Sequence, residues 1–164
     1  MLLVATPKSM EVLILDHRLC YIQQVLELLP PNERNGENIQ YLIYVMEKLF
    51  NINLGYKFRL LAKGPYSRKL FNDLKRLGQD IKCKDELNYK VLKEFIKDLN
   101  SCGLSMRIVL KVIATYVMFT KDVYPRPKDV IKEVSKICRL KDYEVQRVLS
   151  RFRSYLIHYD RIEA

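Results

Sequence analysis

Basic residues concentrate in one short stretch near the middle of the chain. Between residues 57 and 82 there are eight lysines and arginines and two aspartates, a net charge of +6 out of +10 for all 164 residues. Lys and Arg neutralise phosphate groups, and Arg and Asn match the edges of guanine and adenine in the major groove of DNA. The stretch therefore indicates a surface that binds an acidic partner, of which nucleic acid is the commonest.

The spacing of leucines predicts how this stretch is folded. It indicates a helix over residues 67–77, in which the side chain of Ser67 caps the first turn by accepting a backbone N–H. Leu70, Leu74 and Leu77 form its inner face, with Phe71 beside them. The polar residues of the helix are left for the surface.

We predict a nucleic-acid site from these outward residues and their neighbours. Arg68, Asn72 and Arg76 follow the three- and four-residue spacing of one helix face and are expected to contact bases. Flanking lysines are expected to contact phosphates, and Tyr66 is an aromatic ring among cations that a base could stack on. The complete predicted site is Lys63, Tyr66, Ser67, Arg68, Lys69, Asn72, Lys75 and Arg76.

The elements around this helix must position it. An amphipathic helix over residues 39–50 precedes it, and alternation of aromatic and basic residues predicts a strand in residues 56–63. Gly64 and Pro65 are expected to end that strand, and residues 80–84 to form a second strand that returns beside it. We expect a mainly α fold with a small β-hairpin, whose N-terminal half resembles a winged helix-turn-helix.

The remaining apolar patterns predict a C-terminal helical bundle. Further helices are expected after Asp16, over residues 85–101 and 104–120, from Pro127 to Cys138, and over 142–158. The helix over 104–120 is apolar nearly all round, which places it in the core. The predicted organisation is a flexible tail (1–10), a winged-helix-like basic unit (11–103) and a helical unit packed on it (104–164).

Around the basic stretch, the sequence LGYKFRLLAKGPYSRKLFNDLKRL resembles the YwgA-like proteins of bacteria and archaea, an uncharacterised family. Gly64, Pro65, Tyr66 and Ser67 match the core of the family's YGPYS motif, whereas Lys63 replaces its first tyrosine. The resemblance implies a helical protein with a winged-helix-like half and no established reaction. A more distant likeness to SocA/Panacea proteins implies an antitoxin or adaptor that binds another protein.

Other kinds of chemistry find little support. There is no glycine-rich phosphate loop, and four cysteines and two histidines form no zinc pattern, so we expect no enzyme, metal or cofactor. No signal peptide is evident, so we expect a soluble cytoplasmic protein with free thiols and no membrane contact. A second basic set, Arg147, Arg151, Arg153 and Arg161, is opposed by acids and is expected to be solvated surface, an extension of the footprint or a dimer contact.

Two functions follow from these observations. The first is a DNA-binding protein, a transcriptional regulator that contacts double-stranded DNA through the helix over 67–77. A homodimer would suit palindromic sites, although no sequence feature specifies one. The alternative is a protein-interaction adaptor or antitoxin-like module, in which the same basic face meets an acidic protein.

Overall fold

The amphipathic patterns give a mainly helical chain with one small sheet. A computed structural model describes residues 7–77 and 90–161. The elements are α1 (Pro7–Leu28), the 3-10 helix η1 (Pro31–Glu33), α2 (Gly36–Leu49), β1 (Arg59–Leu61), β2 (Gly64–Tyr66), α3 (Arg68–Leu74), α4 (Lys90–Leu99), α5 (Met106–Lys121), α6 (Val130–Cys138), α7 (Asp142–Arg151) and α8 (Arg153–Arg161). The prediction of a mainly α chain with a β-hairpin is confirmed.

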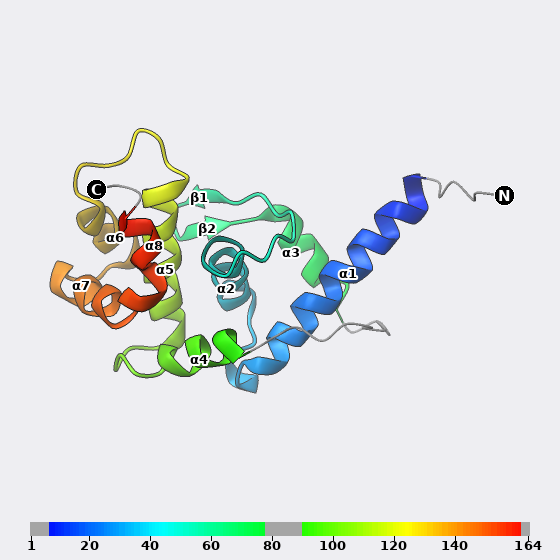
Figure 1. Cartoon of the computed structure of the whole chain (residues 1–164), viewed down its shortest axis with the longest axis horizontal. Helices are drawn as coiled ribbons and strands as arrows, with labels where there is room; N and C mark the ends of the chain where they lie inside the picture. The colour runs from blue at the N-terminus through cyan, green and yellow to red at the C-terminus, as the bar shows by residue number, and fades with distance from the viewer. Residues whose placement is uncertain (1–6, 78–89, 162–164) are drawn as a thin grey trace.

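The core is built around α5. Its residues Val109, Leu110, Val112, Ile113, Ala114 and Val117 are completely buried. The helix packs against α2 and β2 on one side and against α6, α7 and α8 on the other (Figure 1). This arrangement agrees with the central position predicted for residues 104–120. It also joins the two predicted units through one hydrophobic cluster that extends from α1 to α8.

The hairpin has a different second strand from the one predicted. β1 pairs antiparallel with β2, with Arg59 opposite Tyr66 and Leu61 opposite Gly64. Gly64 and Pro65 therefore belong to a strand and do not end one. A proline fits here because each strand of a two-stranded sheet has a free edge, where a missing N–H leaves no partner unsatisfied. The strand predicted at residues 80–84 lies outside the described residues.

Two helices in the N-terminal half begin earlier than predicted. α1 begins at Pro7, and Asp16 is inside it, so the predicted tail overlaps this helix at residues 7–10. Proline is favoured in the first turn because its missing N–H has no helical partner there. α2 begins at Gly36, capped by Asn35, whose side-chain oxygen accepts a hydrogen bond from the Asn38 N–H at 2.9 Å.

Helix boundaries also differ in the C-terminal half. α6 begins at Val130 and not at Pro127, because the Asp129 carboxylate caps it by accepting the Lys132 N–H at 3.1 Å. The helix predicted over 142–158 is divided into α7 and α8 at Phe152. The Phe152 ring is completely buried and lies 5.4 Å from the ring of Phe95, which holds the chain at this break.

Substitution of Gly64 is expected to destabilise the fold. Its φ of +113° is strained for any residue with a Cβ, and an added Cβ would lie 3.1 Å from Thr115 Oγ1 and 3.3 Å from Tyr41 Cε1. Gly64→Ala should therefore lower the free energy of unfolding by about 2 kcal/mol or more, measured by urea denaturation. Gly36→Ala is the matched control, because a Cβ there meets no atom within 4 Å. Equal stability of the two variants would contradict this explanation.

Candidate nucleic-acid interface

The start of α3 is fixed to α2 by a reciprocal pair of buried hydrogen bonds. The Gln40 side-chain amide donates to the Ser67 carbonyl, and the Gln40 side-chain oxygen accepts the Ser67 N–H, both at 2.8 Å. The Ser67 hydroxyl accepts the Leu70 N–H at 3.2 Å, so the predicted helix cap is confirmed. Since Ser67 is completely buried, it positions α3 and is not a contact residue.

The turn of the hairpin is held by a second residue of α2. The hydroxyl of Tyr41 donates to the Lys63 carbonyl at 2.8 Å, which fixes the backbone while the Lys63 side chain remains exposed. Burial, assisted by the nearby Glu37 carboxylate, raises the pKa of Tyr41 to about 12. The hydroxyl therefore stays protonated and keeps donating throughout the neutral range.

The single acidic residue of α3 is turned into the core. Asp73 is 6% exposed, and its carboxylate accepts a hydrogen bond of 2.7 Å from the hydroxyl of Tyr56, which is also 6% exposed. The Arg18 guanidinium lies 5.3 Å from the centre of the Tyr56 ring. Burial and the bond to Asp73 raise the pKa of Tyr56 above its usual range, so this hydroxyl also remains a donor.

With Asp73 buried, the exposed charged side chains of residues 57–77 are all cations. Residues 57–77 contain seven basic residues, all exposed, and Asp73 is the only acid among them. We call these seven the basic face: Lys57, Arg59, Lys63, Arg68, Lys69, Lys75 and Arg76. Asn72 is exposed among them, on the outer side of α3. A polyanion that meets these cations is spared repulsion from the buried Asp73 carboxylate.

Helix α3 is shorter than predicted, which changes how the predicted residues are presented. It ends at Leu74, so Arg68, Lys69 and Asn72 project from the helix, whereas Lys75 and Arg76 lie in the turn after it. Of the inner face, Leu70 is completely buried and Leu74 and Leu77 are partly buried. The helix predicted over residues 67–77 therefore extends three residues beyond the observed end of α3.

Phe71 was expected beside the inner leucines but faces outward. Its side chain is 44% exposed, because a step of one residue around the helix from Leu70 carries it away from the core. The Lys75 ammonium lies 4.6 Å from the centre of its ring, and the Tyr66 ring lies 6.3 Å away. The basic face thus carries an exposed aromatic residue that the leucine spacing did not reveal.

Two residues of the second basic set have a structural task. Arg147 donates to the Cys102 carbonyl at 2.9 Å, and Arg151 donates to the Ser101 hydroxyl at 2.9 Å and lies 3.7 Å from the Asp98 carboxylate. These contacts hold the loop between α4 and α5 against α7. The charges of Arg147 and Arg151 are therefore engaged by their own chain.

The described residues also bear on the expectations about metal sites, membrane spans and thiols. No group of metal-binding side chains is found in the described parts of the chain, and none of their helices is long and apolar enough to cross a membrane. Cys102 and Cys138 are free thiols, as expected, but Cys20 is disulfide-bonded. Burial raises the pKa of the Cys138 thiol to about 11, so it is uncharged at neutral pH.

Comparison of the chain with family models, curated proteins and solved structures finds no match. The resemblance to the YwgA-like proteins therefore stays a prediction. The site must be interpreted from its own geometry.

Removal of the Tyr56 hydroxyl is expected to destabilise the protein. Tyr56→Phe leaves the buried Asp73 carboxylate without this donor and should lower the free energy of unfolding by about 1–3 kcal/mol in urea denaturation. Tyr143→Phe removes the same atom from a side chain that is 61% exposed and should change stability by less than about 0.5 kcal/mol. A Tyr56→Phe protein as stable as this control would show that the hydrogen bond does not hold α3.

Proposed function

We propose that this protein binds double-stranded DNA through the basic face and acts as a regulator of transcription without catalysing a reaction. The observation that carries the proposal is the arrangement of charge on residues 57–77. All seven cations are exposed, and the one carboxylate is buried. Contacts of Lys and Arg with phosphates supply most of the affinity of non-specific DNA binding.

The dimensions and composition of α3 support its entry into the major groove. An α-helix with its side chains is about 10–12 Å across, which fits a major groove about 12 Å wide. Arg68 and Asn72 lie one turn apart and would read guanine and adenine edges, assisted by Arg76 from the following turn. Lys63, Lys69 and Lys75 flank them and would contact phosphates, which set the orientation of the protein.

A winged helix-turn-helix-like arrangement belongs to this proposal. In it, α2 supports α3 from behind, and the hairpin brings Arg59 and Lys63 to the sugar–phosphate backbone. In the described residues the hairpin comes between α2 and α3 in the chain, so the wing precedes the helix that would enter the groove.

The second candidate function is an adaptor that binds an acidic protein. The observation that favours it is Phe71, a large apolar side chain 44% exposed among cations, since exposed aromatic residues often anchor protein interfaces. A pull-down from native extract with and without nuclease separates the two functions. Loss of partners after nuclease treatment supports DNA binding, whereas retention of one protein supports the adaptor.

Salt dependence tests the proposed DNA contact. If about four to six phosphates are contacted, the logarithm of the binding constant for short duplex DNA should fall with log salt with a slope of about −4 to −5. The double variant Arg68→Ala plus Lys69→Ala should weaken binding, and since only Lys69 of the two is assigned to a phosphate, it should make the slope less steep by about 1. Fluorescence anisotropy at several salt concentrations measures both quantities.

A charge-matched control distinguishes a local contact from the effect of net charge. Lys128→Ala plus Lys132→Ala removes two exposed cations at the start of α6, on the other side of α5 from α3 (Figure 1). This variant should bind DNA nearly as the wild type does. Absence of binding by the wild type, or equal loss in both double variants, would refute the role of α3.

Substitution of Asn72 tests whether α3 reads bases. On a duplex selected for tight binding, Asn72→Ala should reduce affinity by about 1–3 kcal/mol and relax the preference at one position, without changing the salt slope. Lys75→Ala should instead weaken binding to all sequences and make the slope less steep by about 1. Unchanged sequence preference in the Asn72 variant would limit the proposal to backbone contacts.

A further inference from the structure

Three adjoining hollows lie along the hairpin, on the side of α2 and α5. The first has a volume of about 520 Å³, the second about 270 Å³ and the third about 400 Å³. Tyr66 lines the first two, Lys63 lines the last two, and Glu37 lines all three. We call these adjoining hollows the hairpin groove, and the first and the third each have a volume within the range of small-ligand sites.

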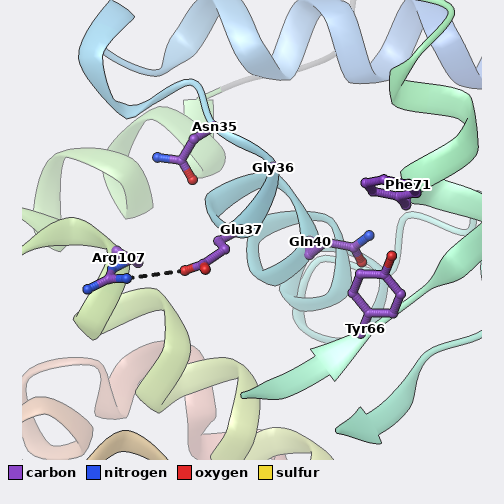
Figure 2. Close-up of a pocket in the computed structure, with 7 residues that line it drawn as sticks. All are labelled: Asn35, Gly36, Glu37, Gln40, Tyr66, Phe71 and Arg107. Carbon is purple, nitrogen blue, oxygen red and sulfur yellow. Dashed lines mark hydrogen bonds and ion pairs between the residues drawn. The ribbon is translucent and has the colours of Figure 1, made fainter. Parts of the chain in front are cut away.

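One end of the groove is aromatic. Tyr66 and Phe71 line it, with ring centres 6.3 Å apart and ring planes inclined by 40°. Figure 2 shows these two rings on one side of the first hollow and the Glu37–Arg107 ion pair on the other. The exposed Phe71 ring offers a face or an edge against which a planar ligand can pack.

The other end of the groove is cationic. The third hollow is lined by Lys63 from the hairpin turn, Arg107 and Lys111 from α5, and Arg139 at the end of α6, with Glu37 as its acid. Four cations against one carboxylate leave a local charge of +3. The Cys138 thiol also lines this hollow, but burial raises its pKa to about 11, so it does not offset the positive charge at neutral pH.

The packing of Lys111 shows that this cationic end is built by the fold. Its Cγ would lie 3.9 Å from a Cβ placed on Gly64, so the aliphatic stem of Lys111 runs along the hairpin backbone. Lys111 and Cys138 line the same hollow, and the Lys111 ammonium lowers the pKa of the Cys138 thiol against the larger effect of burial. Cations from three separate elements converging on one hollow match the charge and shape of a phosphate group.

The order of groups along the groove matches one class of ligand. The Glu37 carboxylate lies between the two ends, and a carboxylate is an acceptor for ribose hydroxyls in nucleotide sites. We propose that the hairpin groove binds a free nucleoside diphosphate, with its base on Tyr66 and Phe71, its ribose at Glu37, and its phosphates among Lys63, Lys111 and Arg139. Side-chain cations here take the place of a glycine-rich phosphate loop.

This nucleotide site is separate from the proposed DNA contact, and an experiment can refute the site without refuting DNA binding. DNA binding is tested on Arg68 and Lys69, neither of which lines the described hollows of the groove. The two sites share Lys63 and Tyr66, and they adjoin at Lys75 and Phe71. A protein that binds duplex DNA but no nucleotide would therefore refute the groove alone.

Calorimetric titration of the full chain tests the proposal with ADP and GDP, and with pyrophosphate and adenosine as fragments. The diphosphates should bind saturably and at least about tenfold more tightly than pyrophosphate, the factor expected when a base stacks on an aromatic side chain. Adenosine should also bind more weakly than ADP. Pyrophosphate binding as tight as ADP binding, or no saturable binding of either diphosphate, would overturn the proposal.

Two variants locate the ligand within the groove. Lys111→Met keeps the aliphatic stem against Gly64 and should weaken ADP and pyrophosphate binding by the same factor, about tenfold. Phe71→Ala alters an exposed side chain and should weaken ADP binding while leaving pyrophosphate binding unchanged. Lys128→Ala plus Lys132→Ala is the charge control and should bind ADP as the wild type does. ADP affinity unchanged in both groove variants would overturn the assignment, and circular dichroism confirms that each variant is folded.

Discussion

The exposed surface of this protein depends on the reciprocal hydrogen bonds between Gln40 and Ser67. Both bonds are 2.8 Å long and buried, and they join the middle of the sequence to α2 at the residue where β2 ends and α3 begins. If α3 were displaced along α2, the Gln40 side chain and the Ser67 backbone would be buried without hydrogen-bond partners, which costs more free energy than an apolar contact in the same place. The two bonds therefore fix the position of α3 on α2. The Ser67 hydroxyl then caps α3, and Leu70 fills the space behind it. The direction of every cation on α3 follows from this attachment.

A second constraint separates the charges. The same stretch of sequence supplies seven cations and one carboxylate, and the fold sends the carboxylate inward to Tyr56 and the cations outward. A buried carboxylate is tolerated when strong donors compensate the loss of water. Tyr56 is such a donor, and the Arg18 guanidinium lies 5.3 Å from the centre of its ring. As a result, the charged side chains that α3 exposes, Arg68 and Lys69, are both cationic, whereas a count of residues would set Asp73 against them.

The sequence predicted those features that depend on local periodicity. The leucine spacing located α3, the serine before it identified the cap, and the apolar character of residues 104–120 placed α5 in the core. Asn35 and Asp129 are residue types that commonly cap helices, but the sequence analysis did not assign them as caps. The turn residues around Asn35 favoured a loop, and Pro127 favoured an earlier start for the helix that follows. The pairing of β1 with β2 could not be foreseen, since Gly64 and Pro65 ordinarily interrupt strands.

The hairpin groove depends on residues that are far apart in the chain and meet only through tertiary packing: Glu37, Lys63, Arg107 and Arg139.

The basic face and the hairpin groove are physically linked through Lys63. Its carbonyl is fixed by Tyr41, while its side chain belongs both to the basic face and to the cationic end of the groove. Phosphates bound in the groove would neutralise this cation, so a nucleotide and a DNA backbone would compete for it. Binding free energies are reciprocal, and whatever DNA affinity a nucleotide removes, DNA removes equally from nucleotide affinity. Lys63 is only one of the seven cations of the basic face. A bound nucleotide would therefore remove at most the contribution of one phosphate contact to DNA affinity, and the other six cations would still bind DNA.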